Sequence, residues 1–185
     1  MPHRRGQGRS PGKYIEDLLA LETRANRSSR LVELQEEHQE DVVAALAFLQ
    51  TLPDADSNRI VIAGCSYGGI QTVLASERKL VIRAAIAFAP AAESWRGSYH
   101  LRERLLRAVR QATVPLLLIQ AENDYDLSPT RALDEEMKKA GKPHKRVVFP
   151  PYGNSAQEGH GGFCFSGGRV WGDEVFSFLD AVMQR

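Results

Sequence analysis

Residues 64–68 read Gly-Cys-Ser-Tyr-Gly and stand between an apolar run and a stretch that can form a helix. A serine with flanking glycines at a strand-to-helix junction is typical of a nucleophile elbow, a turn that pushes the hydroxyl out of the sheet. We therefore predict that Ser66 is a nucleophile and that Gly64 and Gly68 are required because side chains there would collide. The backbone N–H of Tyr67, at the start of the helix, is then placed to bind an oxyanion.

A serine hydroxyl needs a neutral imidazole to take its proton and a carboxylate to orient that imidazole. His160, in the stretch EGHGGF, follows the last apolar run and is the candidate base. The other four histidines occur in the N-terminal tail, on a helix face or beside turns, where a solvated or packing role is expected: His3, His38, His100 and His144.

The orienting carboxylate is sought in AENDYDLSP, which follows an apolar run and offers Glu122, Asp124 and Asp126. The order Ser66, Asp124, His160 is the one expected for this kind of α/β fold, and each of the three follows the end of a different predicted strand. Asp126 can instead cap the helix that begins near Ser128, or be solvated in the loop. The residues alone leave all three carboxylates open.

Four strands and five helices are expected to position these groups. Continuous apolar runs predict buried strands over 59–64, 82–89, 114–120 and 146–149, and apolar spacing predicts helices over 30–53, 68–77, 99–111, 128–140 and from about 170. Ser128 is expected as an N-cap with proline next to it. The alternation predicts an α/β fold, a three-layer α/β/α sandwich with a mainly parallel sheet, whose strand ends carry the candidate residues.

Composition is that of one globular domain covering 1–185, with a loop-rich segment at 1–29. The 24 basic and 23 acidic residues give a net charge of +1, which does not favour nucleic acid or an anionic membrane surface as a partner. No apolar run reaches the roughly 18 residues of a membrane span. We expect a small-molecule or peptide partner and no membrane association.

The two cysteines, Cys65 and Cys164, are far apart in the sequence and lack the spacing of metal ligands. We therefore expect neither a disulfide nor a zinc site, and a reduced, cytoplasmic setting. Cys65 is expected to be a small buried residue rather than a nucleophile. No metal or cofactor is expected.

The chain resembles the α/β-hydrolase superfamily, and within it the dienelactone hydrolase-like and prolyl oligopeptidase-like esterases and peptidases. The likeness rests on Arg5-Gly6-x-Gly8-x-Ser10-x-Gly12, Asp56-x-x-Arg59-Ile60, Gly64-Cys65-Ser66-Tyr67-Gly68-Gly69, Ala121-Glu122-Asn123-Asp124 and Gly159-His160-Gly161. In these families the acid follows a glycine by three positions; Ala121 stands at that position, so the resemblance selects Asp124. Classical dienelactone hydrolases are similar but carry cysteine at the centre of the elbow, where this chain has Ser66.

In the superfamily the segment matched here by 4–12 follows the fourth strand, so the resemblance implies a truncated α/β-hydrolase fold without the N-terminal strands. The strand at 59–64 would then lie at an exposed edge, and the loop that supplies a second oxyanion donor would be absent. We expect a homo-oligomer, or a partner chain, to cover that edge.

The expected function is hydrolysis of small carboxylic esters through a Ser-His-Asp triad and an acyl-enzyme. One alternative is a serine peptidase of prolyl oligopeptidase type, and another is a weakly active or non-catalytic fragment that acts as an interaction module. Trp95 and Phe163 are expected to line a modest substrate pocket, with core packing as the competing interpretation.

Overall fold

The computed structural model describes residues 3–184, and its centre is a four-stranded parallel sheet. The strands lie side by side in chain order: β1 (Val61–Cys65), β2 (Ala84–Phe88), β3 (Leu116–Ala121) and β4 (His144–Phe149). All four strands run in the same direction, so their carboxyl ends lie together at one end of the sheet. This is where α/β folds place their catalytic and binding residues.

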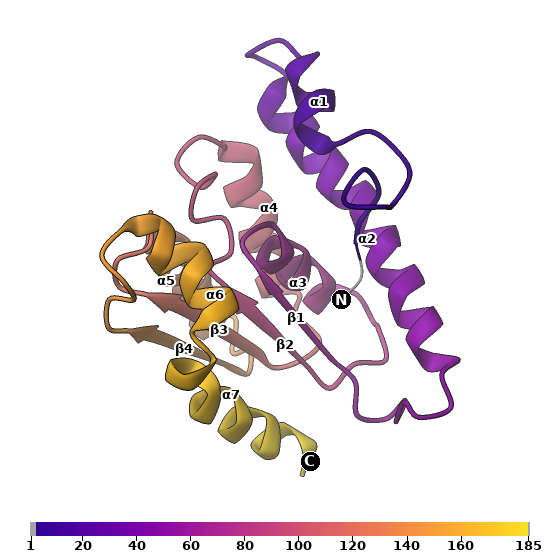
Figure 1. Cartoon of the computed structure of the whole chain (residues 1–185), viewed down its shortest axis with the longest axis vertical. Coiled ribbons are helices and arrows are strands. Elements are labelled where there is room, and N and C mark those ends of the chain that lie inside the picture. Colours follow the sequence, from indigo (N-terminus) through magenta and orange to yellow (C-terminus); the bar gives the residue numbers. More distant parts are fainter. Residues whose placement is uncertain (1–2, 185) are drawn as a thin grey trace.

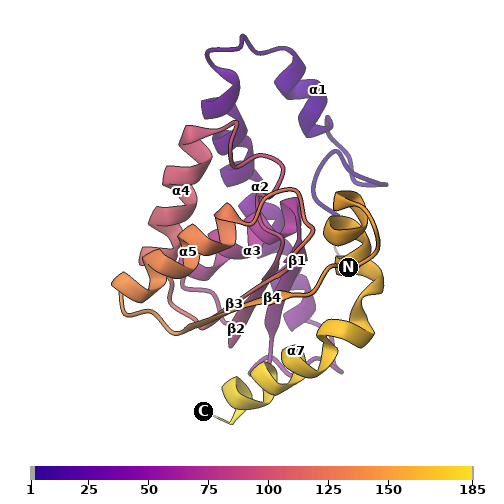
Figure 2. The ribbon, with the colours of Figure 1, turned by 90° about the vertical axis from the view of Figure 1, so that its left-hand side faces the viewer.

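Helices cover both faces of this sheet (Figures 1 and 2). Figure 2 shows α4 and α5 on one side of the strands and α7 on the other. The helices are α1 (Ile15–Ala20), α2 (Arg27–Gln50), α3 (Tyr67–Glu77), α4 (Tyr99–Arg110), α5 (Ser128–Lys139), α6 (Phe163–Ser166) and α7 (Gly168–Met183), with a π-helical turn, η1 (Glu158–Gly162), before α6. The predicted three-layer α/β/α architecture is confirmed.

The two faces of the central strands bury two separate apolar clusters. Leu116 and Leu118 pack with α3, α4 and α5, whereas Leu117 and Ile119 pack with α6 and α7. All four of these leucine and isoleucine side chains are fully buried. A strand that is covered on both faces can be apolar at every position, which is why the sequence shows continuous runs rather than alternation.

The observed elements differ from the sequence predictions mainly at their ends. Each strand begins two residues from its predicted start, and the helix expected from Arg30 begins at Arg27. The segment expected to be loop-rich, 1–29, contains the short helix α1, and the loop expected before the last helix contains η1 and α6. Ser128 is the first residue of α5 rather than its N-cap.

The β1 edge of the sheet borders a large open groove. Within residues 3–184, β1 pairs only with β2. A trough of about 1630 Å³, which we call the β1 trough, is lined by the N-terminal segment, α2, β1 and Ser66. Exposed apolar side chains line it, including Phe48 with 66% and Leu52 with 40% of their surface accessible.

In the part of the chain that the structure describes, none of the helices combines the length and apolarity needed to span a membrane.

Candidate active site

Ser66 occupies the sharp turn between β1 and α3. Its backbone has φ 56° and ψ −114°, a left-handed conformation that a non-glycine residue rarely adopts. The turn is held by a hydrogen bond of 2.9 Å from the Ser66 N–H to the carbonyl of Phe88, the last residue of β2. Tyr67 is the first residue of α3, so its N–H belongs to the helix terminus, where backbone donors lack intrahelical acceptors.

The glycine requirement of this turn differs in part from the prediction. A Cβ on Gly64 would lie 2.3 Å from the carbonyl oxygen of Gly68, and a Cβ on Gly69 would lie 2.7 Å from the carbonyl oxygen of Phe88. A Cβ on Gly68 would meet nothing within 4 Å. Glycine is therefore required for steric reasons at positions 64 and 69. The prediction for Gly68 is wrong, because Gly68 only supplies the backbone with which a side chain at position 64 would collide.

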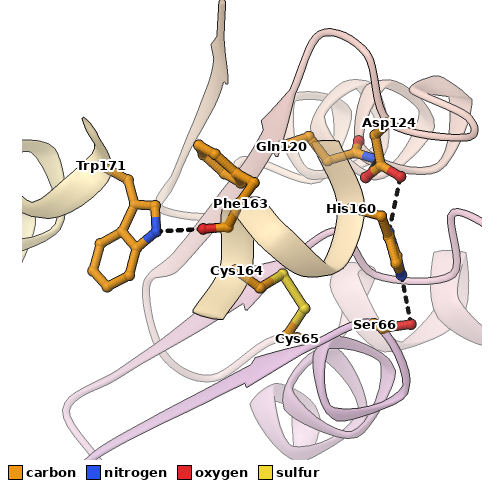
Figure 3. The surroundings of a disulfide bond; sticks show 8 residues. All are labelled: Cys65, Ser66, Gln120, Asp124, His160, Phe163, Cys164 and Trp171. Carbon is orange, nitrogen blue, oxygen red and sulfur yellow. Dashed lines mark hydrogen bonds and ion pairs between the residues drawn. A yellow bond between two sulfur atoms is a disulfide. The ribbon is translucent and has the colours of Figure 1, made fainter. Parts of the chain in front are cut away.

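The structure brings Ser66, His160 and Asp124 together at the carboxyl ends of the strands (Figure 3). His160 Nε2 lies 2.8 Å from Ser66 Oγ, and His160 Nδ1 lies 2.8 Å from Asp124 Oδ1. Because a carboxylate only accepts hydrogen bonds, the imidazole that satisfies both contacts carries its proton on Nδ1 and accepts from the serine at Nε2. This is the tautomer in which an imidazole can take the proton of a serine hydroxyl.

The three candidate acids are clearly separated by their contacts. Asp124 is the one that bonds to His160, and its side chain is fully buried. Glu122 is exposed. Asp126 accepts hydrogen bonds at Oδ1 from the N–H and the hydroxyl of Ser128, at 2.9 and 2.7 Å, and pairs through Oδ2 with Arg96 at 3.0 Å.

These contacts set the charge state of Asp126. Burial by itself raises the pKa of the carboxyl, but the hydrogen bonds from Ser128 and the Arg96 guanidinium outweigh it and hold the pKa below its ordinary value. Asp126 thus remains ionised and bonded to Ser128, the first residue of α5, whereas the carboxylate that bonds to His160 is that of Asp124.

Gln120 holds Asp124, and Thr130 in turn holds Gln120; neither residue was predicted from the sequence. Gln120 Nε2 donates to Asp124 Oδ2 at 2.8 Å, and Gln120 Oε1 accepts at 2.6 Å from the Thr130 hydroxyl. Gln120 is fully buried at the end of β3. The signal was a single amide at the end of an otherwise apolar run, because a buried amide must find polar partners.

Asn123 joins the loop of the acid to the loop of the base. Its side-chain amide donates to the carbonyls of Tyr152 and Ser155, both at 3.0 Å, and its Oδ1 accepts from the Tyr152 N–H at 2.9 Å. Gly159, just before His160, lies against this side chain, and a Cβ there would come within 2.4 Å of Asn123 Oδ1. The positions of the acid and the base are therefore set by one shared network.

The Tyr67 side chain is fixed from the opposite side, by α2 and the N-terminal segment. Its hydroxyl lies 2.6 Å from His38 Nδ1, and the Arg4 guanidinium lies over its ring, 3.9 Å from the centroid. Burial raises the pKa of the Tyr67 hydroxyl, so it stays protonated. Burial, and next the charge of Arg4, lower the pKa of His38, which favours its neutral form.

The prediction that Trp95 and Phe163 line a substrate pocket is wrong. Phe163 is fully buried against Phe149 and Tyr152, in the apolar cluster on the α6 and α7 side of the sheet. Trp95 is 6% exposed and belongs to the apolar cluster on the other side of the sheet, with α3, α4 and α5. The aromatic ring beside the site is instead that of Tyr125, 43% exposed, with its centroid 5.2 Å from that of His160.

The two cysteines form a disulfide, which overturns the expectation that they are unpaired. Cys65 and Cys164 are bonded across 99 residues of sequence, directly beside the Ser66 turn (Figure 3). Sequence distance says nothing about spatial distance once the chain folds back on itself. The expectation of a reduced, cytoplasmic setting rested on unpaired cysteines and loses that basis.

Within residues 3–184 there is no group of three or more His, Cys, Asp or Glu side chains that could hold a metal ion.

Comparison with known proteins bears on both fold and family. The family model of the dienelactone hydrolase family matches residues 19–161. No curated protein matches the chain. Among solved structures, the Pyrococcus furiosus esterase is 17% identical with a TM-score of 0.66, and the match covers 97% of this chain and 68% of the esterase.

Two peptidases share the same fold. Pyrococcus horikoshii acylaminoacyl peptidase is 22% identical with a TM-score of 0.54, over 66% of this chain and 24% of the peptidase. A putative dipeptidyl aminopeptidase IV from Bacteroides ovatus is 19% identical with a TM-score of 0.61, over 80% and 23%. The chain thus spans about a quarter of the length of these peptidases.

Proposed function

Because the chain belongs to the dienelactone hydrolase family, we propose that it is a serine hydrolase that cleaves small carboxylic esters. The observation that carries this proposal is the pair of 2.8 Å contacts that His160 makes with Ser66 and Asp124. They connect a nucleophile, a base and an orienting carboxylate, which is the arrangement that activates a serine hydroxyl.

In the proposed reaction, Ser66 Oγ attacks the ester carbonyl while His160 Nε2 takes its proton. Asp124 accepts the hydrogen bond from Nδ1 and stabilises the imidazolium that forms. The Tyr67 N–H donates to the oxyanion of the tetrahedral intermediate. His160 then gives the proton to the leaving alkoxide, which produces an alcohol and an acyl-enzyme.

Deacylation repeats these steps with water as the nucleophile. His160 takes a proton from the water, the hydroxide oxygen attacks the acyl carbonyl, and the carboxylic acid leaves as Ser66 regains its proton. Since the Ser66 site opens into the β1 trough, an ester can approach from solvent.

The test is reaction with a fluorophosphonate probe, together with hydrolysis of p-nitrophenyl acetate and butyrate. Wild type should be labelled and should hydrolyse both esters, and Ser66→Ala should do neither while keeping its far-ultraviolet circular dichroism. Folded wild type that resists the probe would leave the non-catalytic interaction module as the better proposal. Labelling of Ser66→Ala at the wild-type rate would remove Ser66 from the mechanism.

A peptidase activity is the second candidate, and the likeness in fold to two peptidases supports it. An aminoacyl-proline p-nitroanilide compared with p-nitrophenyl acetate separates the two, because an amide needs a better-stabilised transition state than an activated ester. We expect kcat/KM for the ester to exceed that for the anilide. The reverse order would make the protein a peptidase.

A further inference from the structure

The Cys65–Cys164 disulfide joins the two elements between which the proposed proton transfer takes place. Cys65 is the residue before Ser66, at the end of β1, and Cys164 lies in α6, four residues after His160. Their Cα atoms are 6.1 Å apart. In Figure 3 the disulfide lies next to the His160–Ser66 hydrogen bond. It connects the ribbon segment that carries Ser66 to the segment that carries His160.

On the serine side, the bridge supports an edge strand. Within residues 3–184, β1 has a hydrogen-bonded neighbour on one side only, β2, and its other side faces the β1 trough. Such a strand has backbone groups without strand partners and is held less firmly than a central strand. Ser66 also holds a left-handed backbone conformation, which lasts only where its surroundings enforce it.

On the histidine side, the bridge supports a short irregular segment. His160 lies in the five-residue π-helical turn η1, which continues directly into the four-residue helix α6. A π-helical turn is rare, and short helices are marginal without tertiary contacts. Phe163 fixes the segment to the core beneath it, but the disulfide fixes it to the strand of the nucleophile.

We infer that this disulfide is a positioning bridge, which holds Ser66 and His160 at hydrogen-bonding distance, and that its reduction slows acylation. The inference rests on the proposed serine hydrolase function. A misplacement of about 1 Å between reacting groups can cost on the order of 100-fold in rate. Since α3, the sheet and the core also hold the two segments, the expected loss is smaller, about tenfold.

The chemical step is an exchange with a dithiol such as dithiothreitol. Its two S–H bonds and the Cys65–Cys164 bond break, an S–S bond forms within the reagent, and two electrons with two protons pass to the cysteines as thiols. Cys65 is partly exposed and lines the β1 trough, so the reagent can reach the bond from the side on which substrate approaches. The chain has two cysteines in all, so every thiol effect is an effect of this bridge.

The experiment measures oxidised and dithiothreitol-reduced wild type, with kcat and KM for p-nitrophenyl acetate and the rate of fluorophosphonate labelling. Reduction should lower kcat and the labelling rate about tenfold with KM changed less than twofold. Removal of dithiothreitol and reoxidation should restore both. Cys164→Ala should match the reduced wild type and should not respond to dithiothreitol, which controls for effects of the reagent itself.

Each other outcome has a definite meaning. If oxidised wild type is neither active nor labelled, the proposed function fails. If oxidised and reduced wild type react at equal rates, the function stands and the positioning bridge is wrong. If reduction abolishes the far-ultraviolet circular dichroism signal, the bridge is a staple for the whole fold, and the inference is likewise overturned. Should Cys164→Ala fail to fold, the reduction and reoxidation of wild type still decide the question.

Discussion

Gln120 donates its hydrogen bond to Oδ2 of Asp124, while His160 bonds to Oδ1 of the same carboxylate. The Tyr125 N–H also donates to Oδ1, at 2.7 Å. Both oxygens of Asp124 are therefore held from different directions, and the carboxylate cannot rotate without breaking a hydrogen bond. A carboxylate fixed in this way keeps the imidazole in one orientation and one tautomer.

Gln120→Leu should lower kcat about tenfold with little change in KM, because Asp124 Oδ2 loses its donor and the carboxylate becomes free to turn. Steady-state kinetics on p-nitrophenyl acetate measure this. Thr130→Val is the graded comparison, since it leaves the amide in place but removes the hydroxyl that orients it. We expect its kcat to fall less than that of Gln120→Leu. An equal kcat for wild type, Gln120→Leu and Thr130→Val would contradict the role of Gln120 in holding Asp124.

The two aspartates of the acid loop should respond very differently to neutralisation. Asp124→Asn leaves an amide that can favour the wrong tautomer of His160, so kcat should fall by a factor on the order of 10⁴. Asp126→Asn should keep kcat within about threefold and should lower the free energy of unfolding by about 1 kcal/mol, because it weakens the hydrogen bonds to Ser128 and removes the charge that pairs with Arg96. Urea unfolding and ester kinetics on both variants give the answer, and a larger kcat loss in Asp126→Asn would reverse the assignment.

Gly159→Ala should disturb the base, because the added Cβ would come 2.4 Å from Asn123 Oδ1 and 2.8 Å from the Asn123 carbonyl carbon. Since backbone cannot yield as a flexible side chain can, His160 should move, and kcat should fall on the order of 100-fold. The matched control is Gly161→Ala, on the other side of the histidine, where a Cβ meets nothing within 4 Å. Comparable losses in the two variants would show that the effect is not the contact with Asn123.

Stability should decline as the pH falls below about 6.5, the ordinary pKa of histidine. Burial lowers the pKa of His38 in the folded protein, so the unfolded chain binds this proton at a higher pH than the folded chain does. The free energy of unfolding then decreases between the unfolded pKa and the lower folded one. Urea unfolding at pH 7.5 and 5.5 measures the difference, which His38→Gln should reduce; an undiminished difference in the variant would assign it to other groups.

We propose that two copies of the chain associate over the part of the β1 trough that carries Phe48 and Leu52, which leaves the Ser66 part open to substrate. Within residues 3–184 one side of β1 has no strand partner, and that side and these exposed apolar side chains face the trough. Sedimentation velocity should show a dimer at micromolar concentration. Phe48→Glu should weaken the dimer, whereas Phe176→Glu should not, since Phe176 is equally exposed but does not line the trough. A wild-type monomer at all concentrations would end this proposal.

The sequence was most informative where a local pattern determines the structure. Continuous apolar runs such as 114–120 predicted the buried strands, because a strand covered on both faces is apolar throughout. The first residue of each strand was displaced by two positions, since the apolar run and the hydrogen-bonded ladder need not start together. The elbow at Ser66 was recognisable because its glycine spacing reflects a local steric demand, although the demand falls on Gly64 and Gly69.

Features that depend on long-range contacts were missed. The Cys65–Cys164 bond joins residues that are 99 positions apart, and no local sequence pattern predicts that β1 and α6 are neighbours. Phe163 could not be assigned to core or pocket, because an aromatic residue suits either and only the packing of the final helices decides. The support of Asp124 by Gln120 likewise needed the loop geometry, although the isolated amide in the apolar run pointed to some buried polar partner.

The disulfide also closes a covalent ring from Cys65 to Cys164, and Ser66, Asp124 and His160 all lie within it. A protease that cuts once inside this ring, for example in the exposed turn after Lys139, leaves the two pieces tied together. Such nicked protein would run as a single full-length band on a non-reducing gel and as two fragments under reduction. The three residues would thus stay on one connected molecule after damage that would split a chain without the bridge.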